Sequence, residues 1–431
     1  MSRRHLLQIT GLGSLATVGA MSLAGCATGV KAPAASASAS AFTGPRTGKD
    51  LQVYMNPAHV YPAYTDVFTA FEKEHGIKVT VSALQWADMI TKLTAGFLAG
   101  DVPDLCEDSG TAPGWGVAGD VRNLNDFVSR DGKAMGFPDD FQQAAVDVWK
   151  VGNDTYAIPL HLTCNGLIFY NKEMLDAAGL GVPTTWDEFR SAAKALTRGG
   201  VHGAALNQDS SYTWPWLLQS GAQYYEASSK QFLTPAEDAT KALQFLQDML
   251  FKDGSSPIPV SSTDPTGPQK LLSNKQVAMM ISGPWDIAPI QKAAPGLQLG
   301  LGAPLKGSDP KTSLAGAGLM IPAKAQNSEL AWELLKKLTA VKVELEATKQ
   351  AGMTMPRKSW GTDGAVKDDP LLSVVAKSLP LATNTQGVIS QNKNLNSINT
   401  AYTAAWQQIA IQHQSVASSL DAFRNTVKAY V

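Results

Sequence analysis

The feature that most constrains the fold is an alternation of strand-like and helix-like segments that begins at residue 51. The segments, in order, are a strand at 51–55, a helix at 62–74, a strand at 77–81, a helix at about 86–98 and a strand entered at 103–106. Apolar residues recur at helical spacing in the helices, and they alternate with polar residues in the second strand. This order favours parallel strands with helices packed on the faces of the sheet.

The same alternation returns in the middle of the chain. The later segments are a strand at 167–170, a helix around 171–178, helices at 186–196 and 237–250, a strand at 277–281, and helices at 328–339 and 396–429. A chain of 431 residues is too long for one compact core. Because the strands gather in two places, we expect two α/β lobes.

The N-terminus carries an export signal. Arg3 and Arg4 precede a glycine-rich apolar stretch at 11–25 that is too short to be a good membrane span. Cys26 then follows Leu-Ala-Gly, which resembles a lipoprotein cleavage site, and the arginine pair resembles a twin-arginine signal; an ordinary Sec signal is the alternative. We expect residues 1–25 to be a signal peptide, Cys26 to be lipidated, and residues 26–48 to tether the chain to the outer face of the membrane.

Composition excludes several classes of function. The net charge is −1 and there is no basic block, so a nucleic-acid partner is not expected. The six histidines are scattered without ligand-like spacing, so neither a metal site nor a cofactor is predicted. Cys106 and Cys164 are expected to be two separate buried thiols.

Catalytic signatures are weak. Residues 114–119 match the pattern G-x-G-x-x-G, but no helical pattern opens there, as a dinucleotide-binding turn requires. The serine elbow, the H-E-x-x-H helix and the P-loop do not occur in the sequence. Carboxylates are plentiful, so an exported carbohydrate-active enzyme remains an alternative function.

A set of short phrases, in a constant order over residues 50–360, is more specific. They are WAD (86–88), AGDVPD (99–104), YAIP (156–159), LIFYNKEML (167–175), PTTWDEF (183–189), AMMISGPW (278–285), GAG (316–318) and MIP (320–322). Together they resemble the extracellular solute-binding proteins of family 1, the maltose-binding-protein-like group that serves ABC importers. The resemblance implies a lipid-anchored binding protein, not an enzyme, that delivers a carbohydrate to the transmembrane subunits of an importer and acts as a monomer.

The resemblance also implies a two-lobed periplasmic-binding-protein-like α/β fold. Each lobe would be a mostly parallel sheet flanked by helices, with the ligand in the cleft between the lobes. The chain would cross between lobes near 159–165 and again near 300–304. The N-terminal lobe would contain residues 49–160 and about 303–360, and the C-terminal lobe would contain residues 161–302 and about 361–431.

A sugar site needs aromatic faces for the ring and polar groups for the hydroxyls. Loops at strand ends, the first crossover and the positions that match the family supply the candidates. The predicted ligand-binding residues are Asn56, His59, Glu107, Asp108, Ser109, Trp115, His161, Asn165, Asp209, Tyr212, Trp285, Gly316, Gly318 and Arg357. Thr163 and Cys164 stand where an acidic ligand contact would be expected, which argues against maltose itself.

The aromatic stretch NQDSSYTWPW at 207–216 divides into two parts. Pro215 suits the first turn of a helix, so Trp214 and Trp216 are expected to pack in the interior. Asp209 and Tyr212, in the loop before that helix, are expected to face the ligand. A glycerophosphodiester or a polyamine is the alternative to a sugar, and Arg357 is the candidate phosphate contact.

Overall fold

The computed structural model describes residues 50–431, apart from 262, 263, 265, 266 and 393. The predicted signal peptide, the lipidation of Cys26 and the tether lie outside these residues. None of the helices in the described part of the chain combines the length and the hydrophobicity that a membrane crossing requires.

Six strands form the first sheet. They are β1 (Leu51–Met55), β2 (Val79–Ala83), β3 (Leu105–Asp108), β6 (Ile158–Asn165), β13 (Thr312–Met320) and β14 (Ala382–Thr383). The order is β14-β13-β3-β1-β2, and β6 also pairs with β13. Strand β1 is parallel to both β2 and β3, as the alternation of strands and helices predicts.

Two helices separate the three parallel strands of this sheet. Helix α1 (Pro62–His75) begins at a proline, and helix α2 (Trp86–Ala99) follows β2. Gly76 and Gly100 end these helices in the left-handed conformation, with φ of 63° and 77°. Both helices therefore lie within a residue of the predicted bounds.

The second sheet contains β7 (Leu167–Asn171), β8 (His202–Ala205), β11 (Val277–Ser282) and β12 (Leu299–Gly302) in the order β12-β7-β11-β8. Strand β8 is parallel to β11, but β7 is antiparallel to both β11 and β12. Strand β7 therefore runs opposite to the other strands of this sheet, whereas β8, β11 and β12 share one direction, so the second sheet is mostly parallel as expected.

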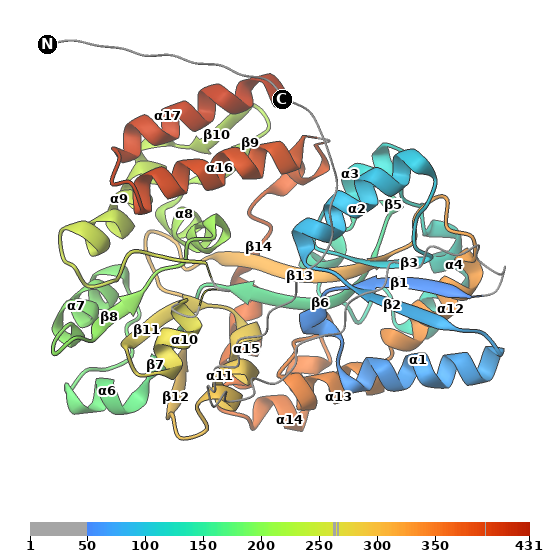
Figure 1. Cartoon of the computed structure of the whole chain (residues 1–431), viewed down its shortest axis with the longest axis horizontal. Helices are drawn as coiled ribbons and strands as arrows, with labels where there is room; N and C mark the ends of the chain where they lie inside the picture. The colour runs from blue at the N-terminus through green and yellow to red at the C-terminus, as the bar shows by residue number, and fades with distance from the viewer. Residues whose placement is uncertain (1–49, 262–263, 265–266, 393) are drawn as a thin grey trace, which may run out of the picture. The chain divides into compact units, whose positions relative to one another are not determined.

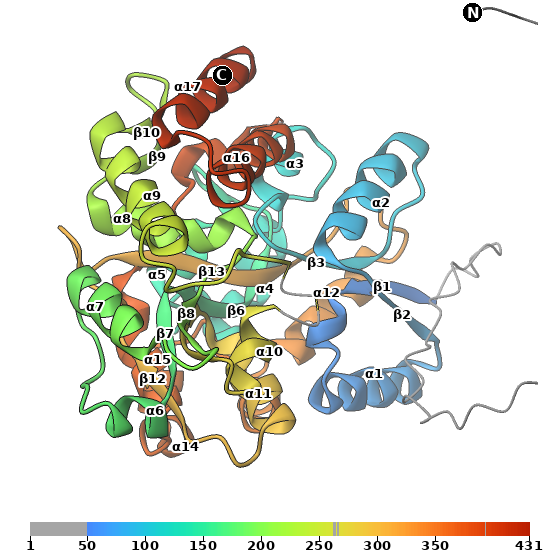
Figure 2. The same cartoon turned by 60° about the vertical axis from the view of Figure 1, so that its left-hand side comes forward.

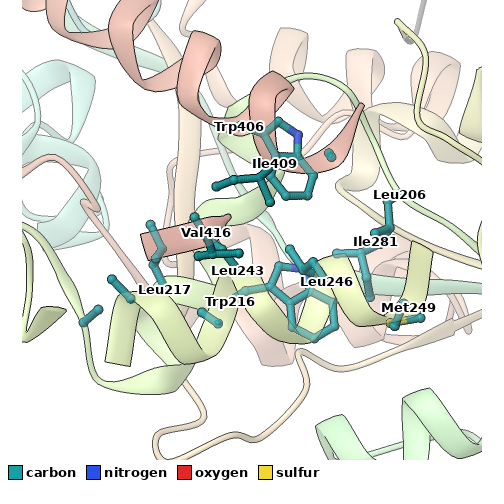
Figure 3. Packing of buried hydrophobic residues seen from close by; sticks show 14 of the residues in the cluster. Leu206, Trp216, Leu217, Leu243, Leu246, Met249, Ile281, Trp406, Ile409 and Val416 are labelled. Atoms are coloured by element: carbon teal, nitrogen blue, oxygen red, sulfur yellow. The ribbon is translucent and has the colours of Figure 1, made fainter. Parts of the chain in front are cut away.

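Helices from distant parts of the chain share the core beside the second sheet. They are α7 (Trp186–Leu196), α8 (Trp214–Ser220), α9 (Ala236–Phe251), α16 (Leu395–Ala410) and α17 (Val416–Val427). Figure 3 shows Trp216 with Leu243 and Leu246 of α9, below Trp406 and Ile409 of α16. The continuous helix expected at 396–429 is broken into α16 and α17, where His413 has a φ of 54°. Figure 2 shows the two helices turning back on each other.

Strands β6 and β13 run side by side and antiparallel between two groups of elements, the first built around the first sheet and the second built around the second sheet (Figure 1). Residues 299–302 pair with β7, and Lys306 forms a bridge to Thr185 beside α7. The chain therefore returns to the first sheet at β13, later than the crossover predicted at 300–304.

Shorter elements complete the described chain. The remaining α-helices are α3 (Ala112–Val117), α4 (Asn125–Met135), α5 (Gln143–Asp147), α6 (Lys172–Ala177), α10 (Pro268–Ser273), α11 (Ile287–Ala293), α12 (Ser328–Leu338), α13 (Val341–Ala351), α14 (Gly364–Lys367) and α15 (Leu372–Ser378). The remaining strands are β4 (Lys150–Val151), β5 (Asp154–Thr155), β9 (Gln223–Glu226) and β10 (Gln231–Thr234). Short 3-10 turns include η1 (Pro57–His59), η2 (Ser210–Thr213), η3 (Pro284–Asp286) and η6 (Gly387–Gln391).

The structure settles two local expectations, on the glycine-rich stretch at 114–119 and on the two cysteines. Helix α3 contains residues 114–117, where no helical pattern was expected, so the G-x-G-x-x-G match begins inside a helix and not at a turn that opens one. Cys106 and Cys164 are both buried and free, which confirms the prediction of two separate thiols.

Candidate functional site

A cavity of about 210 Å³ lies where β6 and β13 meet loops from both groups of elements. The walls come from the β3–α3 loop, the segment after α5, the middle of β6 and β13, the start of α8, the loop after β14, and α16. Residues from distant parts of the sequence therefore converge on one space. A concave site that gathers aromatic and polar groups in this way is the expected form of a small-molecule site.

Two indole rings line this cavity. Trp149 is 3% exposed, and it packs so closely on β13 that a Cβ added at Gly318 would lie 2.8 Å from the ring. Trp214 is half-buried and contacts Tyr224 edge to face, with ring centroids 5.9 Å apart. The Nε1 of Trp214 has no hydrogen-bond partner among the described residues. The cavity is thus lined by the closely packed ring of Trp149 and by the ring of Trp214, whose Nε1–H is available to a ligand.

Amide and hydroxyl side chains form the other side of the cavity. The polar lining residues here are Asn384, Thr385, Gln386, Ser390, Asn396 and Asn399. The Gln386 Nε2 donates to Asn399 Oδ1 at 2.7 Å, and Thr385 Oγ1 donates to Ser313 Oγ at 2.8 Å. These bonds orient two of the polar groups before any ligand arrives.

The β3–α3 loop is held in place by Asp108. This buried carboxylate accepts hydrogen bonds from the backbone nitrogens of Gly110 and Ala112 and from Thr111 Oγ1. Burial raises the pKa of Asp108, and these hydrogen bonds oppose the shift. Asp108 therefore positions Ser109 and Thr111, which line the cavity, and is not itself a lining residue.

A polar cluster lies next to the cavity wall. Glu107 is fully buried, and its Oε1 lies 2.5 Å from His59 Nδ1 and 3.7 Å from His161 Nδ1. Burial lowers the pKa of His161 well below the usual histidine value, and the neighbouring His59 adds to this shift. His161 also lines the cavity, so this cluster adjoins the candidate site.

The structure brings three of the predicted site residues to the cavity, namely Ser109, His161 and Gly316. Gly318 lies behind the wall and leaves room for Trp149. Gly316 allows β13 to approach β6, since a Cβ there would lie 2.4 Å from the carbonyl oxygen of His161.

Other predicted residues serve the framework beside the site. Asn56 caps the turn η1 by accepting from Ala58 N, and it donates its own backbone N–H to Glu107. Asn165 ends β6 and donates to Ser211 O at 3.2 Å. Trp115 packs edge to face on Phe97, with centroids 5.2 Å apart. Their hydrogen bonds and ring contacts are all made to other parts of the protein.

The predicted roles within residues 207–216 are largely reversed. Tyr212 is not among the residues that line the cavity, and it accepts a hydrogen bond from Trp285 Nε1 at 3.1 Å, with the rings edge to face. Asp209 accepts from Ser211 N and caps η2. Trp214 lines the cavity instead, while Trp216 packs in the core as expected.

Arg357 is also placed differently from the prediction. Its guanidinium is 3% exposed and is bonded to Glu344, Asp140 and two backbone carbonyls. Arg357 is not among the residues that line the cavity, and its buried bonds hold the framework of the protein.

Sequence reasoning missed Trp149 and the polar residues at 384–399. Trp149 follows a short helix that carries no strong periodicity, and residues 384–399 lie in a segment that matches none of the family phrases. Clusters of Asn, Ser and Gln at 384–399 were the available signal, since such residues are common where hydroxyl groups are bound.

Comparison with known proteins agrees with this architecture. The family model for bacterial extracellular solute-binding proteins matches residues 57–344, which is more than half of the chain. A galactooligosaccharide-binding protein of Bacillus subtilis (strain 168) is 24% identical over 381 residues, covering 85% of this chain and 86% of that protein.

Two solved structures show the same fold. A solute-binding protein of an ABC transporter from Thermotoga lettingae TMO, bound with alpha-D-tagatose, superposes with a TM-score of 0.78 at 22% identity, covering 89% of this chain and 99% of that one. UgpB from Mycobacterium tuberculosis, in complex with glycerophosphocholine, superposes with a TM-score of 0.76 at 18% identity. The superposition covers 88% of this chain and 98% of that one. The match over residues 57–344 decides the family: this chain belongs to the bacterial extracellular solute-binding proteins.

Proposed function

We propose that this protein captures an uncharged carbohydrate in the cavity between β6, β13 and α16 and delivers it to an ABC importer. The observation that carries the proposal is the lining itself, in which two indoles and a set of amides and hydroxyls surround a cavity of about 210 Å³. Indole faces suit the C–H face of a sugar ring, and amides both donate to and accept from hydroxyl groups.

The charge of the lining separates a sugar from the alternatives. Among the described lining residues the side chains are neutral or imidazole, with neither carboxylates nor Lys or Arg. A phosphodiester is best recognised by Arg or Lys, and a polyamine by carboxylates. The galactooligosaccharide-binding relative supports a neutral ligand, whereas the glycerophosphocholine complex of UgpB makes a phosphodiester the main competitor.

We propose binding without turnover. The cavity would close around its ligand when the two groups of elements move together, and the transporter would recognise the closed form. In this arrangement the N-terminal lobe contains residues 49–160 and about 312–360, because the chain returns at β13, and the C-terminal lobe contains 161 to about 311 and about 361–431. Strands β6 and β13 would carry the hinge, since they pair along most of their length.

The test is a calorimetric screen of the purified protein with neutral mono- and oligosaccharides, glycerophosphocholine and spermidine. We expect saturable binding of a neutral sugar, with a rise in melting temperature, and no new product in the mixture after prolonged incubation. Binding of glycerophosphocholine or spermidine alone, or catalytic formation of a product, would overturn the proposal. Light scattering of the same samples tests the proposed monomeric state.

The membrane attachment is a separate proposal. We infer that Cys26 carries the lipid and that residues 26–48 form the tether, because Leu-Ala-Gly-Cys follows the apolar stretch. Labelling of cells with palmitate should mark the wild-type chain and leave Cys26→Ser unmarked. Replacement of Arg3 and Arg4 by lysine should block export if the twin-arginine route is used, and leave it intact if it is not.

A further inference from the structure

Three segments that are far apart in the sequence bring metal-ligating side chains together beside the cavity. His59 ends the turn η1, Glu107 lies in β3, and His161 lies in β6. One ligating atom from each residue lies within 4.8 Å of the other two. The wide sequence spacing explains why the scattered histidines gave no metal prediction.

His161 is the residue that most clearly lacks a partner. Its side chain is 1% exposed, and its Nδ1 has no hydrogen-bond partner among the described residues. Buried ring nitrogens normally have one. The other nitrogen, Nε2, lies 2.9 Å from the hydroxyl of the fully buried Tyr64. With the proton on Nε2, this contact fixes the ring, and Nδ1 directs a lone pair towards Glu107, as in a metal-ligating histidine.

Glu107 is held in a similar way. Its Oε2 accepts from the backbone nitrogen of Asn56 at 2.8 Å, which leaves Oε1 directed at both histidines. Within the described part of the chain, its ion-pair partners are His59 and His161. A buried carboxylate without Lys or Arg beside it is costly unless a cation neutralises it.

The distances are close to those of a coordinated ion. Tetrahedral zinc with bonds of about 2.0–2.2 Å separates its ligand atoms by about 3.4 Å. The His161 Nδ1 to Glu107 Oε1 distance is 3.7 Å. The His59 Nδ1 contact of 2.5 Å must open by about 1 Å, and His59 has room to move because its side chain is 14% exposed.

We propose that His59, Glu107 and His161 form a binding site for a divalent transition-metal ion of the Zn²⁺ type. Two imidazoles and one carboxylate suit zinc, with a fourth position left for water, whereas Ca²⁺ and Mg²⁺ prefer oxygen ligands alone. The proposal does not depend on the identity of the transported solute.

The test uses the full chain, purified without a histidine tag and stripped with a chelator. Titration with Zn²⁺ should give one bound ion per chain and a higher melting temperature, and Co²⁺ should give the visible absorption of a tetrahedral site. Ca²⁺ and Mg²⁺ should have no effect on the melting temperature. Binding of Ca²⁺ as tight as that of Zn²⁺ would contradict the assignment to a transition metal.

Variants identify the site. His59→Gln removes a partly exposed ligand and should weaken Zn²⁺ binding at least tenfold, and Tyr64→Phe, which keeps all three ligands, should weaken it by about 10-fold. His202→Gln, a histidine outside the cluster, should bind as the wild type does. Circular dichroism establishes that each variant is folded. Equal Zn²⁺ binding by His59→Gln and the wild type, or no Zn²⁺ binding by the wild type in the titration, would overturn the proposal.

Discussion

The Nε of Arg357 donates to Oε2 of Glu344 at 2.9 Å, and the two side chains are 3% and 0% exposed. The same guanidinium donates to the carbonyl oxygens of Met135, at the end of α4, and of Thr339, between α12 and α13. It also contacts Asp140 at 3.2 Å. Four of the five N–H groups of Arg357 therefore bond to other parts of the protein, which ties α4, Asp140 and the α12–α13 segment together.

We expect Arg357→Met to lower the free energy of unfolding by about 3–5 kcal/mol, because it leaves Glu344 buried without its cation. Chemical denaturation measures this change. The double variant Arg357→Met, Glu344→Met should recover part of the loss, since both charges are then removed. If Arg357→Met kept its stability but lost carbohydrate affinity, a ligand-binding role for Arg357 would be restored.

The local patterns in the sequence are good predictors of single elements and poor predictors of what faces the ligand. Helix α7 matches its predicted bounds because Thr185 and Glu188 form a capping box and apolar residues recur on one face. The roles of Tyr212 and Trp214 could not be separated in this way. They are two residues apart, and the Tyr212 ring is held by Trp285, which is distant in sequence, whereas the Trp214 ring contacts Tyr224.

The order of strands was likewise predictable only where helices alternate with strands. The parallel pairs of β1 follow from that alternation. The antiparallel direction of β7 could not be predicted in this way, because its sheet neighbours β11 and β12 lie far along the chain. Residues 384–399 reach the cavity only because α16 packs beside α9, a contact between segments about 150 residues apart that no local pattern contains.

The raised pKa of Asp286 predicts that the stability of the fold depends on pH. Burial raises the pKa of this carboxyl from 3.8 to about 6, although the hydroxyl of Ser282 donates to it at 2.5 Å and opposes the shift. A raised pKa means that the folded state binds the proton more tightly than the unfolded state does. The contribution of Asp286 to the free energy of unfolding is therefore fully present below pH 3.8 and is lost as the pH rises through 6.

The variant Asp286→Asn isolates this effect. Relative to the wild type, it should become more stable between pH 4 and pH 7 by about 1–2 kcal/mol, less than the full shift implies because Asp286 keeps some exposed surface. Denaturation curves at both pH values, with Asp209→Asn as a control at an exposed turn, measure the difference. A constant difference between Asp286→Asn and the wild type at all pH values would refute the assignment.

Trp214 and Tyr212 give opposite predictions for ligand binding. Trp214 lines the cavity, so Trp214→Ala should weaken the binding of a neutral sugar at least tenfold, or about 1.4 kcal/mol. Tyr212→Phe removes a hydroxyl that accepts from Trp285 outside the cavity, so it should leave the affinity unchanged. Calorimetric titration of both variants decides between the two rings. A larger loss in Tyr212→Phe than in Trp214→Ala would restore the placement predicted from the sequence.

Gly316 lies in the cavity wall, at a point where β13 packs closely against β6. A Cβ at this position would lie 2.4 Å from the carbonyl oxygen of His161, so Gly316→Ala must push β13 and β6 apart. Such overpacking costs about 1–3 kcal/mol, and we expect both a lower melting temperature and weaker sugar binding because the two strands form one wall of the cavity. Gly181→Ala is the matched control, since an added Cβ there meets no atom within 4 Å. If Gly316→Ala were as stable as Gly181→Ala and bound sugar normally, the two strands could separate without disturbing the site, and the close approach at Gly316 would have no part in binding.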